Sequence, residues 1–260
     1  MAQPIRRKRT VKKNKPRFFG KWFLVVFSFF LLLIITIGIY KFRDGFLYYL
    51  GFKTDKYANE LSADERKLTD IRIYEVLHKH DNKAIGFDVS EYQSEIDWEQ
   101  TYHIDEAFEL SFVFIRSTAG KDKIDSKFKE NWKAAKERQL IRGAYHYYRP
   151  NENSIEQAEN FIKTVKLQKG DLPPVLDIEK LPKSQSIDSL KVGLRRWLNR
   201  VEKHYKVKPI IYSGESYYTD FLKEEFSEYP LWIANYNFWR NDLESDWQFW
   251  QFTERAQIEG

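Results

Sequence analysis

Residues 174–179 read Pro-Val-Leu-Asp-Ile-Glu, a short apolar run that closes on two carboxylates at alternate positions. The run is rich in branched aliphatic residues and follows Pro173, so it predicts a buried strand. Side chains at positions i and i+2 of a strand project to the same face. We therefore expect Asp177 and Glu179 to point into a common space, with Ile178 on the opposite face.

Six further runs of this kind lie on either side of it, separated by longer polar segments with helical periodicity. The seven predicted strands are 84–90, 112–118, 141–148, 174–179, 209–213, 230–236 and 247–253. The predicted helices lie near 95–108, 126–139, 154–167, 187–205 and 215–224. Apolar strands that are each followed by a helical crossover predict an α/β protein with a parallel sheet covered by helices.

Seven such strands in one domain favour a β/α barrel, irregular or incomplete relative to a TIM barrel. The alternative is an open doubly wound sheet, which usually carries a glycine-rich phosphate turn after its first strand. The segment GFDVSEYQ at 86–93 has one glycine followed by an acid, so the barrel is the better prediction.

Acidic residues close two of the predicted strands. In a β/α barrel the active site lies at the carboxyl ends of the strands, and Asp88 ends the first strand as Asp177 and Glu179 end the fourth. Crowded carboxylates in a poorly solvated cleft raise the pKa of one of them, which leaves a protonated acid beside an ionised partner. A single strand-end aspartate often caps a helix or pairs with a lysine, but three together favour the chemistry of glycoside hydrolysis.

The composition is that of a globular protein with a basic extension. The 260 residues are 42% hydrophobic and contain no cysteine, which excludes disordered, collagen-like and disulfide-stapled classes and leaves the redox compartment open. Residues 1–21 hold nine lysines and arginines and no acid, which leaves 34 basic against 38 acidic groups in the rest. The larger part of the chain is slightly acidic, so nucleic-acid binding is not indicated.

Residues 22–40 form an uncharged, strongly apolar stretch of 19 residues. As a helix it would be about 28 Å long, which approaches the hydrocarbon thickness of a bilayer. The basic cluster before it predicts a single-pass membrane protein with a cytoplasmic tail at 1–21 and an extracytoplasmic domain at 83–260. A cleaved signal peptide is the alternative, but no small-x-small site follows Ile39. Residues 41–82 are expected to form a membrane-proximal connector, helical from about 61 to 80 with an apolar side made by Ile71, Tyr74, Val76 and Leu77.

Seven sequence blocks occur in the order seen in glycoside hydrolase family 25. They are GFDVSEYQ at 86–93 with Ile96-Asp97-Trp98, FVFIRSTAG at 112–120, GAYHYYRP at 143–150, PVLDIE at 174–179, PIIYSG at 209–214, LWIANY at 231–236 and WQFWQFT at 247–253. Over about residues 84–260 the chain resembles a lysozyme of the Chalaropsis type. The resemblance implies an N-acetylmuramidase that cleaves the β-1,4 bond between N-acetylmuramic acid and N-acetylglucosamine in peptidoglycan, without a metal or an organic cofactor.

The resemblance also assigns roles to individual residues. Glu179 matches the proton donor, and Asp177 and Asp88 match the acids that assist at the reacting sugar, by a route that involves either the substrate's N-acetyl group or direct attack by water. The sugar contacts that it implies are Tyr147, Tyr212, Trp232, Tyr236 and Gln251. His146, beside Tyr147, alternates to the outer face of its strand and is expected to pack under a helix.

Two features depart from the family pattern. Ala119 precedes Gly120 where family members usually carry a glutamate, and the family's last strand, which bears an aspartate, has no counterpart before Gly260. A non-catalytic peptidoglycan-binding or scaffold module on the same fold is therefore a second hypothesis. A barrel hydrolase that acts on another glycan is a third. The expected partners are peptidoglycan glycan strands and, through one N-terminal helix, the membrane.

Overall fold

The structure is a computed structural model, and it describes residues 26–33, 36, 63–93, 95–104, 107–237, 240, 242–243 and 247–258. The chain divides into two compact units, Met1–Glu60 and Leu61–Gly260. In the first unit residues 26–33 are helical, with exposed apolar side chains such as those of Phe29 and Leu32. Within the described ranges, no helix combines the length and apolar character that crossing a bilayer requires. The rest of the predicted span at 22–40, except Thr36, lies outside the described residues, as do the tail at 1–21 and residues 41–62.

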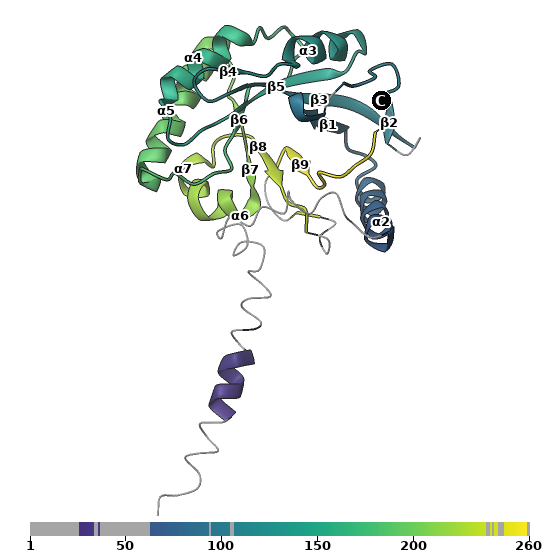
Figure 1. The fold of residues 1–260 in the computed structure, drawn as a ribbon, viewed down its shortest axis with the longest axis vertical. Coiled ribbons are helices and arrows are strands. Elements are labelled where there is room, and N and C mark those ends of the chain that lie inside the picture. The colour runs from purple at the N-terminus through teal and green to yellow at the C-terminus, as the bar shows by residue number, and fades with distance from the viewer. Residues whose placement is uncertain are drawn as a thin grey trace, which may run out of the picture. The chain divides into compact units, whose positions relative to one another are not determined.

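The second unit contains a curled parallel sheet, which confirms the predicted fold class in the form of a half-barrel (Figure 1). All seven predicted strands are present, in the order β1-β3-β5-β6-β7-β8-β9, and each pairs in parallel with its neighbours. They are β1 (Ile85–Val89), β3 (Phe108–Ala119), β5 (Ile141–Tyr147), β6 (Val175–Asp177), β7 (Ile210–Gly214), β8 (Leu231–Ala234) and β9 (Phe249–Gln251). Two short strands, β2 (His103–Ile104) and β4 (Lys123–Ile124), pair antiparallel with β3.

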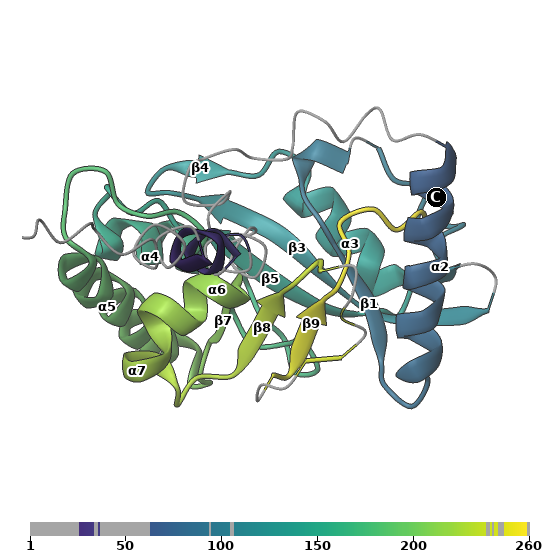
Figure 2. The same ribbon diagram turned by 90° about the horizontal axis from the view of Figure 1, so that it is seen from below.

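The helices that follow the strands cover the outer face of the sheet (Figure 2). They are α3 (Phe128–Glu137), α4 (Ser154–Thr164), α5 (Ile187–Tyr205) and a broken helix of three pieces: α6 (Glu215–Tyr217), the π-helical η3 (Tyr218–Leu222) and α7 (Lys223–Phe226). Helix α4 begins where Asn153 accepts hydrogen bonds from the backbone N–H groups of Ile155 and Glu156, a standard N-cap. Four of the five predicted helices are thus confirmed.

The helix predicted near 95–108 is wrong. Only turns, the short 3-10 helix η2 (Glu91–Gln93) and strand β2 occupy the described part of the connection between β1 and β3. Here the carboxylate of Asp97 accepts hydrogen bonds from the backbone N–H of Glu99 and from the side chain of Gln100. Such local bonds offer the backbone an alternative to helix, and the burial of Trp98 and Ile104 fixes the turn against the domain.

Helix α2 (Ala63–Lys79) belongs to the second unit and packs against the rest of it. Val76 and Leu77 are buried, as expected, together with Ile73, whereas Ile71 and Tyr74 on the predicted apolar side are exposed. The guanidinium of Arg72 donates to the carbonyl oxygens of Phe252 (2.6 Å) and Arg240 (3.1 Å), two residues far along the chain. The helix is therefore held by both apolar and polar contacts to the end of the domain.

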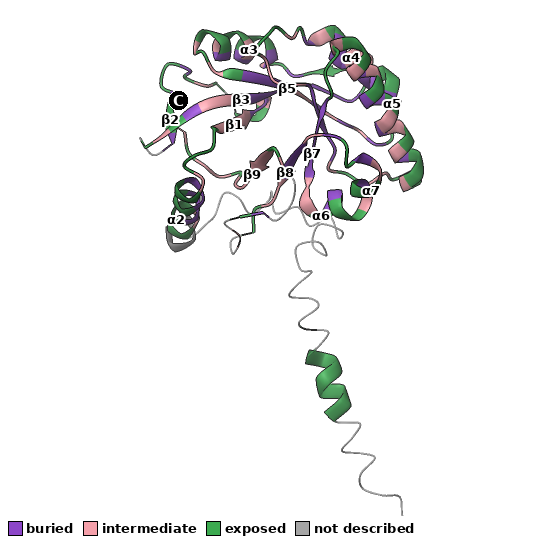
Figure 3. Cartoon of the chain, turned by 180° about the vertical axis from the view of Figure 1, so that it is seen from behind, coloured by how far each residue is buried: buried purple, intermediate pink, exposed green. Residues whose placement is uncertain are grey.

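An aromatic cluster packs inside the half-barrel. The central strands β6, β7 and β8 are mostly buried, whereas the edge strands β1 and β9 are mostly of intermediate exposure (Figure 3). The rings of Phe114 and Trp232 stack with centroids 4.3 Å apart, and Tyr212 meets Trp232 edge-on at 4.5 Å. Gly143 makes room for them, because a Cβ atom there would lie 2.5 Å from the ring of Phe114. The cluster forms the floor beneath the carboxyl ends of the strands.

Candidate active site

The three predicted acids meet in one pocket at the carboxyl ends of the strands. A cavity of about 80 Å³ is lined by Asp88, Tyr145, Asp177, Glu179, Tyr212 and Trp232. Asp88 lies in β1, Asp177 ends β6, and Glu179 follows it by two residues. Beyond Asp177 the chain stays tied to the sheet, since the backbone N–H of Ile178 donates to Tyr212 (3.0 Å) and the hydroxyl of Ser213 donates to the carbonyl of Ile178 (2.7 Å).

Asp177 has the most strongly perturbed environment of the three. It is 4% exposed, and its Oδ1 atom finds no hydrogen-bond partner within the described part of the chain. Burial raises the pKa of Asp177 well above its ordinary value, and the neighbouring charges of Glu179 and Asp88 raise it further, against a smaller opposing effect of Arg116. Burial and crowding with Glu179 and Asp88 thus favour the protonated form of Asp177.

Asp88 is held from the opposite edge of the sheet. The side-chain amide of Gln251, in β9, donates through Nε2 to Oδ2 of Asp88 at 2.6 Å, although 163 positions separate the two residues. Burial raises the pKa of Asp88 to about 6, the hydrogen bond from Gln251 lowers it, and the charge of Glu254 raises it. The edge strands β1 and β9 therefore meet through a side-chain contact at the mouth of the pocket.

The predicted sugar contacts fall into two groups. Tyr212 and Trp232 line the pocket, and each is less than a tenth exposed, so only a small part of each ring faces the cavity. Gln251 and Tyr236 are not among the lining residues; the hydroxyls of Tyr212 (2.7 Å) and Tyr236 both donate to Oε1 of Gln251. Tyr147 pairs in register with Asp177 but is not among the lining residues, and the ammonium of Lys180 lies 5.4 Å from its ring centroid.

Sequence reasoning passed over two residues at this end of the sheet. Tyr145 lines the pocket, and alternation along β5 was a usable signal because Tyr145 and Tyr147 share a face. Arg116 is buried in β3 and pairs with Asp125 (2.7 Å) and Glu91 (3.0 Å). Its position in the run FVFIRST gave no signal of a role, because the two acids that hold it lie in separate connections.

His146 packs under a helix, as predicted. The ring is fully buried on the outer side of the sheet, with Nδ1 2.7 Å from the hydroxyl of Thr118 and Nε2 3.2 Å from Oε1 of Gln157. It also stacks on Trp197 of α5. No cluster of three or more histidine, aspartate or glutamate side chains with the arrangement of a metal site occurs among the described residues.

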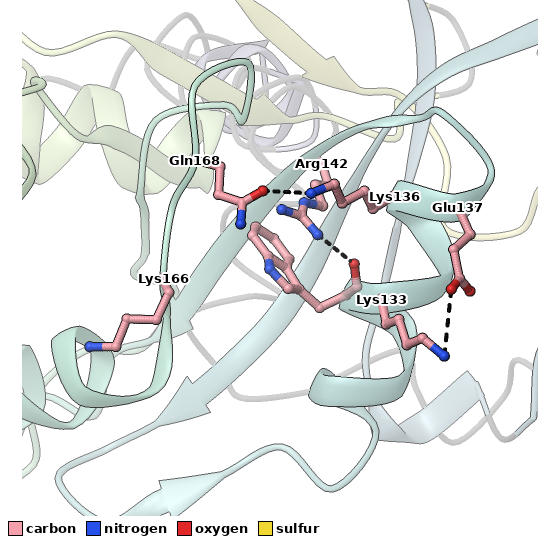
Figure 4. Close-up of a pocket in the computed structure, with 7 residues that line it drawn as sticks. Lys133, Lys136, Glu137, Arg142, Lys166 and Gln168 are labelled. Atoms are coloured by element: carbon pink, nitrogen blue, oxygen red, sulfur yellow. Dashed lines mark hydrogen bonds and ion pairs between the residues drawn. The ribbon is translucent and has the colours of Figure 1, made fainter.

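A larger cavity of about 640 Å³ lies away from this chemistry, lined by Trp132, Lys133, Lys136, Glu137, Arg142, Lys166 and Gln168 (Figure 4). It lies beside the start of β5, at the amino ends of the strands. In β/α barrels that end of the sheet contributes to stability, and the active site lies at the opposite end. Its polar groups are already engaged: Lys136 donates to Gln168 (2.7 Å), Lys133 pairs with Glu137 (3.5 Å), and Arg142 pairs with Asp171 (2.8 Å). Its charges thus stabilise the surface between α3 and β5, and the carboxylate pocket is the candidate active site.

Comparisons with known proteins agree with this geometry. Residues 87–260 match the model of the glycosyl hydrolases family 25. The chain is 41% identical over 177 residues to the uncharacterized protein YegX of Escherichia coli (strain K12), covering 67% of this chain and 65% of that protein. It is 30% identical over 190 residues to lysozyme M1 of Streptomyces globisporus, covering 67% and 63% of the two chains. The match therefore spans somewhat less than two thirds of the length of these relatives.

Solved structures show the same fold. A family 25 glycosyl hydrolase from Bacillus anthracis superposes with a TM-score of 0.61 at 30% identity, covering 68% of this chain and 82% of that one. A muramidase from Trichobolus zukalii superposes with a TM-score of 0.59 at 25% identity, covering 68% and 91%. The family model spans two thirds of the chain and includes every strand-end acid singled out above, so this chain belongs to glycosyl hydrolase family 25.

Proposed function

We propose that the protein is a peptidoglycan hydrolase that cleaves the β-1,4 bond between N-acetylmuramic acid and N-acetylglucosamine. The observation that carries the proposal is the convergence of Asp88, Asp177 and Glu179 on one pocket at the carboxyl ends of the strands. Family membership and the similarity to lysozyme M1 support the same substrate. The cavity of about 80 Å³ has room for a few atoms of the reacting sugar, so the remainder of a glycan would lie over the rim.

The proposed chemistry divides the work between the acids. Glu179, which is more exposed than Asp177, protonates the glycosidic oxygen as the bond to the anomeric carbon breaks. The buried Asp177 keeps a proton available to the pair, because two carboxylates in close contact cannot both ionise easily. Asp88 stabilises the positive character that develops at the anomeric carbon. Water, or the substrate's own N-acetyl group followed by water, completes the hydrolysis.

Tyr147, Tyr212, Trp232 and Tyr236 belong to the proposal as residues that shape the sugar site. Tyr212 and Trp232 supply aromatic edges inside the pocket, and Tyr147 lies beside Asp177 in the sheet register. No metal and no organic cofactor enters the proposed reaction.

The substitution Glu179→Gln tests the proposed reaction. Release of reducing ends from purified sacculi should fall about 10²- to 10⁴-fold, the usual contribution of a general acid, with the circular dichroism spectrum unchanged. Glu224→Gln, at an exposed position of α7, is the matched control and should retain full activity. Near-normal turnover by Glu179→Gln would refute the assignment. Binding of the parent protein to sacculi without any release would indicate the non-catalytic module instead, and preferential cleavage of chitin-like oligomers would indicate another glycan.

We also propose that residues 22–40 anchor the protein in the cell membrane as a single-pass helix, with residues 1–21 in the cytoplasm. The uncharged stretch and the nine basic residues before it support this orientation. Protease added to intact spheroplasts of the producing cell should digest the domain at 83–260. If the domain were protected from the protease until the cells were lysed, the proposed topology would be contradicted.

A further inference from the structure

Gln251 is the point where the two edges of the sheet are joined at the pocket. Its amide makes three hydrogen bonds to side chains: Nε2 donates to Oδ2 of Asp88 (2.6 Å), and Oε1 accepts from the hydroxyls of Tyr212 (2.7 Å) and Tyr236. An amide oxygen has two lone pairs. Both are used here by protein groups, so the carbonyl end of Gln251 is occupied before any sugar arrives.

The Asp88 carboxylate decides which way the amide faces, because an ionised carboxylate can only accept a hydrogen bond and so takes the NH₂ end. A phenolic hydroxyl can donate or accept, and the hydroxyls of Tyr212 and Tyr236 donate to the remaining end, Oε1. The reversed amide would bring Oε1 against the Asp88 carboxylate, where two acceptors repel one another unless the aspartate carries a proton. The arrangement therefore favours the ionised form of Asp88 in one fixed position.

We infer that Gln251 is a positioning residue of the proposed hydrolase: bound at Oε1 by Tyr212 and Tyr236, its amide holds the Asp88 carboxylate, in its ionised form, toward the reacting sugar. This inference rests on the proposed function and replaces the direct sugar contact that the sequence led us to expect of Gln251. Asp88 alone would be driven toward protonation by burial, and the bond from Gln251 opposes that effect. The hydrogen bond from the Gln251 amide thus favours the ionised form of Asp88, which the proposed stabilisation of positive charge at the anomeric carbon requires.

Several other titratable groups surround Asp88, and each acts on it in a known direction. Glu254 follows β9, and its negative charge opposes the ionisation of Asp88. Asp177 ends β6, and the charge of Asp88 raises its pKa. Tyr145 of β5, Tyr212 of β7 and Tyr236 after β8 have pKa values raised by burial and by nearby acids including Asp88, so they remain neutral in the working range. A change of the group at position 251 is therefore expected to act on Asp88.

The decisive variant is Gln251→Glu, because a protonated glutamic acid reproduces the amide. Its O–H can donate to Asp88 and its carbonyl can accept from the tyrosines, whereas an ionised glutamate sets a second negative charge against Asp88. Release of reducing ends by Gln251→Glu should approach the parent rate near pH 5. It should fall about 10- to 100-fold relative to the parent by pH 8, the loss expected for one hydrogen bond to a charged group. Gln251→Leu should lose most kcat at pH values below the raised titration midpoint of Asp88 and less above it, with KM for soluble glycan oligomers little changed. Gln168→Glu, at an exposed position between α4 and β6, is the matched control with a parent-like pH profile.

A second measurement keeps the inference separate from the proposed activity. Carboxyl ¹³C NMR of Asp88 should show its titration midpoint at higher pH in Gln251→Leu than in the parent. This holds whether or not the protein degrades sacculi, so failure of the proposed function would leave the NMR result standing. An Asp88 midpoint that is the same in both proteins would overturn the inference. So would a Gln251→Glu profile parallel to the parent, or a loss confined to KM, which would indicate a direct sugar contact.

Discussion

Replacement of Asp88 by asparagine should make the fold more stable at neutral pH while it removes activity. In the folded protein burial raises the pKa of Asp88 from 3.8 to about 6. A shift of one unit corresponds to about 1.4 kcal/mol, so the ionised carboxylate costs the folded state at most about 3 kcal/mol at pH 7. Asparagine carries no charge, and its side-chain oxygen can still accept the hydrogen bond from Gln251.

The pH dependence has a definite sign. Because the folded-state pKa lies above the unfolded value, the native protein binds more protons than the unfolded chain between about pH 4 and pH 6. The contribution of Asp88 to stability is therefore most favourable below pH 4 and declines as the pH rises through 6. Asp88→Asn lacks this decline, so the two proteins should differ little at pH 4 and by about 1–3 kcal/mol at pH 7.5.

Urea unfolding followed by tryptophan fluorescence at pH 4, 5, 6 and 7.5 measures the difference. Asp122→Asn, at an exposed turn position, is the matched control and should follow the parent at every pH. The reasoning would be refuted if Asp88→Asn were no more stable than the parent at pH 7.5. It would also be refuted if the difference in free energy of unfolding between the two proteins did not change with pH. The physical claim at stake is that this site keeps a charge in a place where burial disfavours it.

Three further outcomes follow from buried groups. Burial lowers the pKa of His146 from 6.5 to about 3, so the ring should stay neutral and its ¹⁵N shifts should not titrate between pH 5 and 8. Because the folded-state pKa is depressed, the contribution of His146 to stability is present above pH 6.5 and is lost as the pH falls toward 3. A titration near pH 6.5 would contradict this. Asp171→Asn should reduce the free energy of unfolding by about 3–5 kcal/mol, because it leaves the guanidinium of Arg142 without its buried charged partner at 2.8 Å. A loss under 1 kcal/mol in urea titrations would show that the ion pair does not stabilise the fold. Trp232→Ala should reduce the free energy of unfolding by about 3–5 kcal/mol, because the stack on Phe114 is lost, and it should also weaken glycan binding. Unchanged stability in the same urea titrations would show that the ring does not contribute to the core.

Much of the fold could be predicted from local patterns. Strand β6 and helix α5 (Ile187–Tyr205) could be located from periodicity because their apolar residues recur with the period of the element they form. The strand-end positions of Asp88 and Asp177 were also available, since a polar residue that closes an apolar run is visible in the sequence. Where local side-chain bonds competed with periodicity, as at Asp97, the prediction failed.

The candidate site could be predicted only in part. The acids were named from spacing and resemblance, but the lining role of Tyr145 was not, although it shares a strand face with Tyr147. The role of Gln251 depended on which group faced it across the edges of the sheet. Nothing in the run WQFWQFT indicates whether its glutamine meets a sugar, an acid or a tyrosine.

The sequence by itself therefore determined the alternation of strands and helices, the family, and the acids that close two of the strands. The tertiary structure alone decided that β1 and β9 approach closely enough for Gln251 to bond Asp88 across 163 positions, and that two tyrosine hydroxyls bind the oxygen of the same amide. The physical reason is the distance along the chain over which each kind of interaction acts. Helix and strand preferences act over a few neighbouring residues, whereas the charge state and position of a buried carboxylate depend on every group that the curled sheet brings against it.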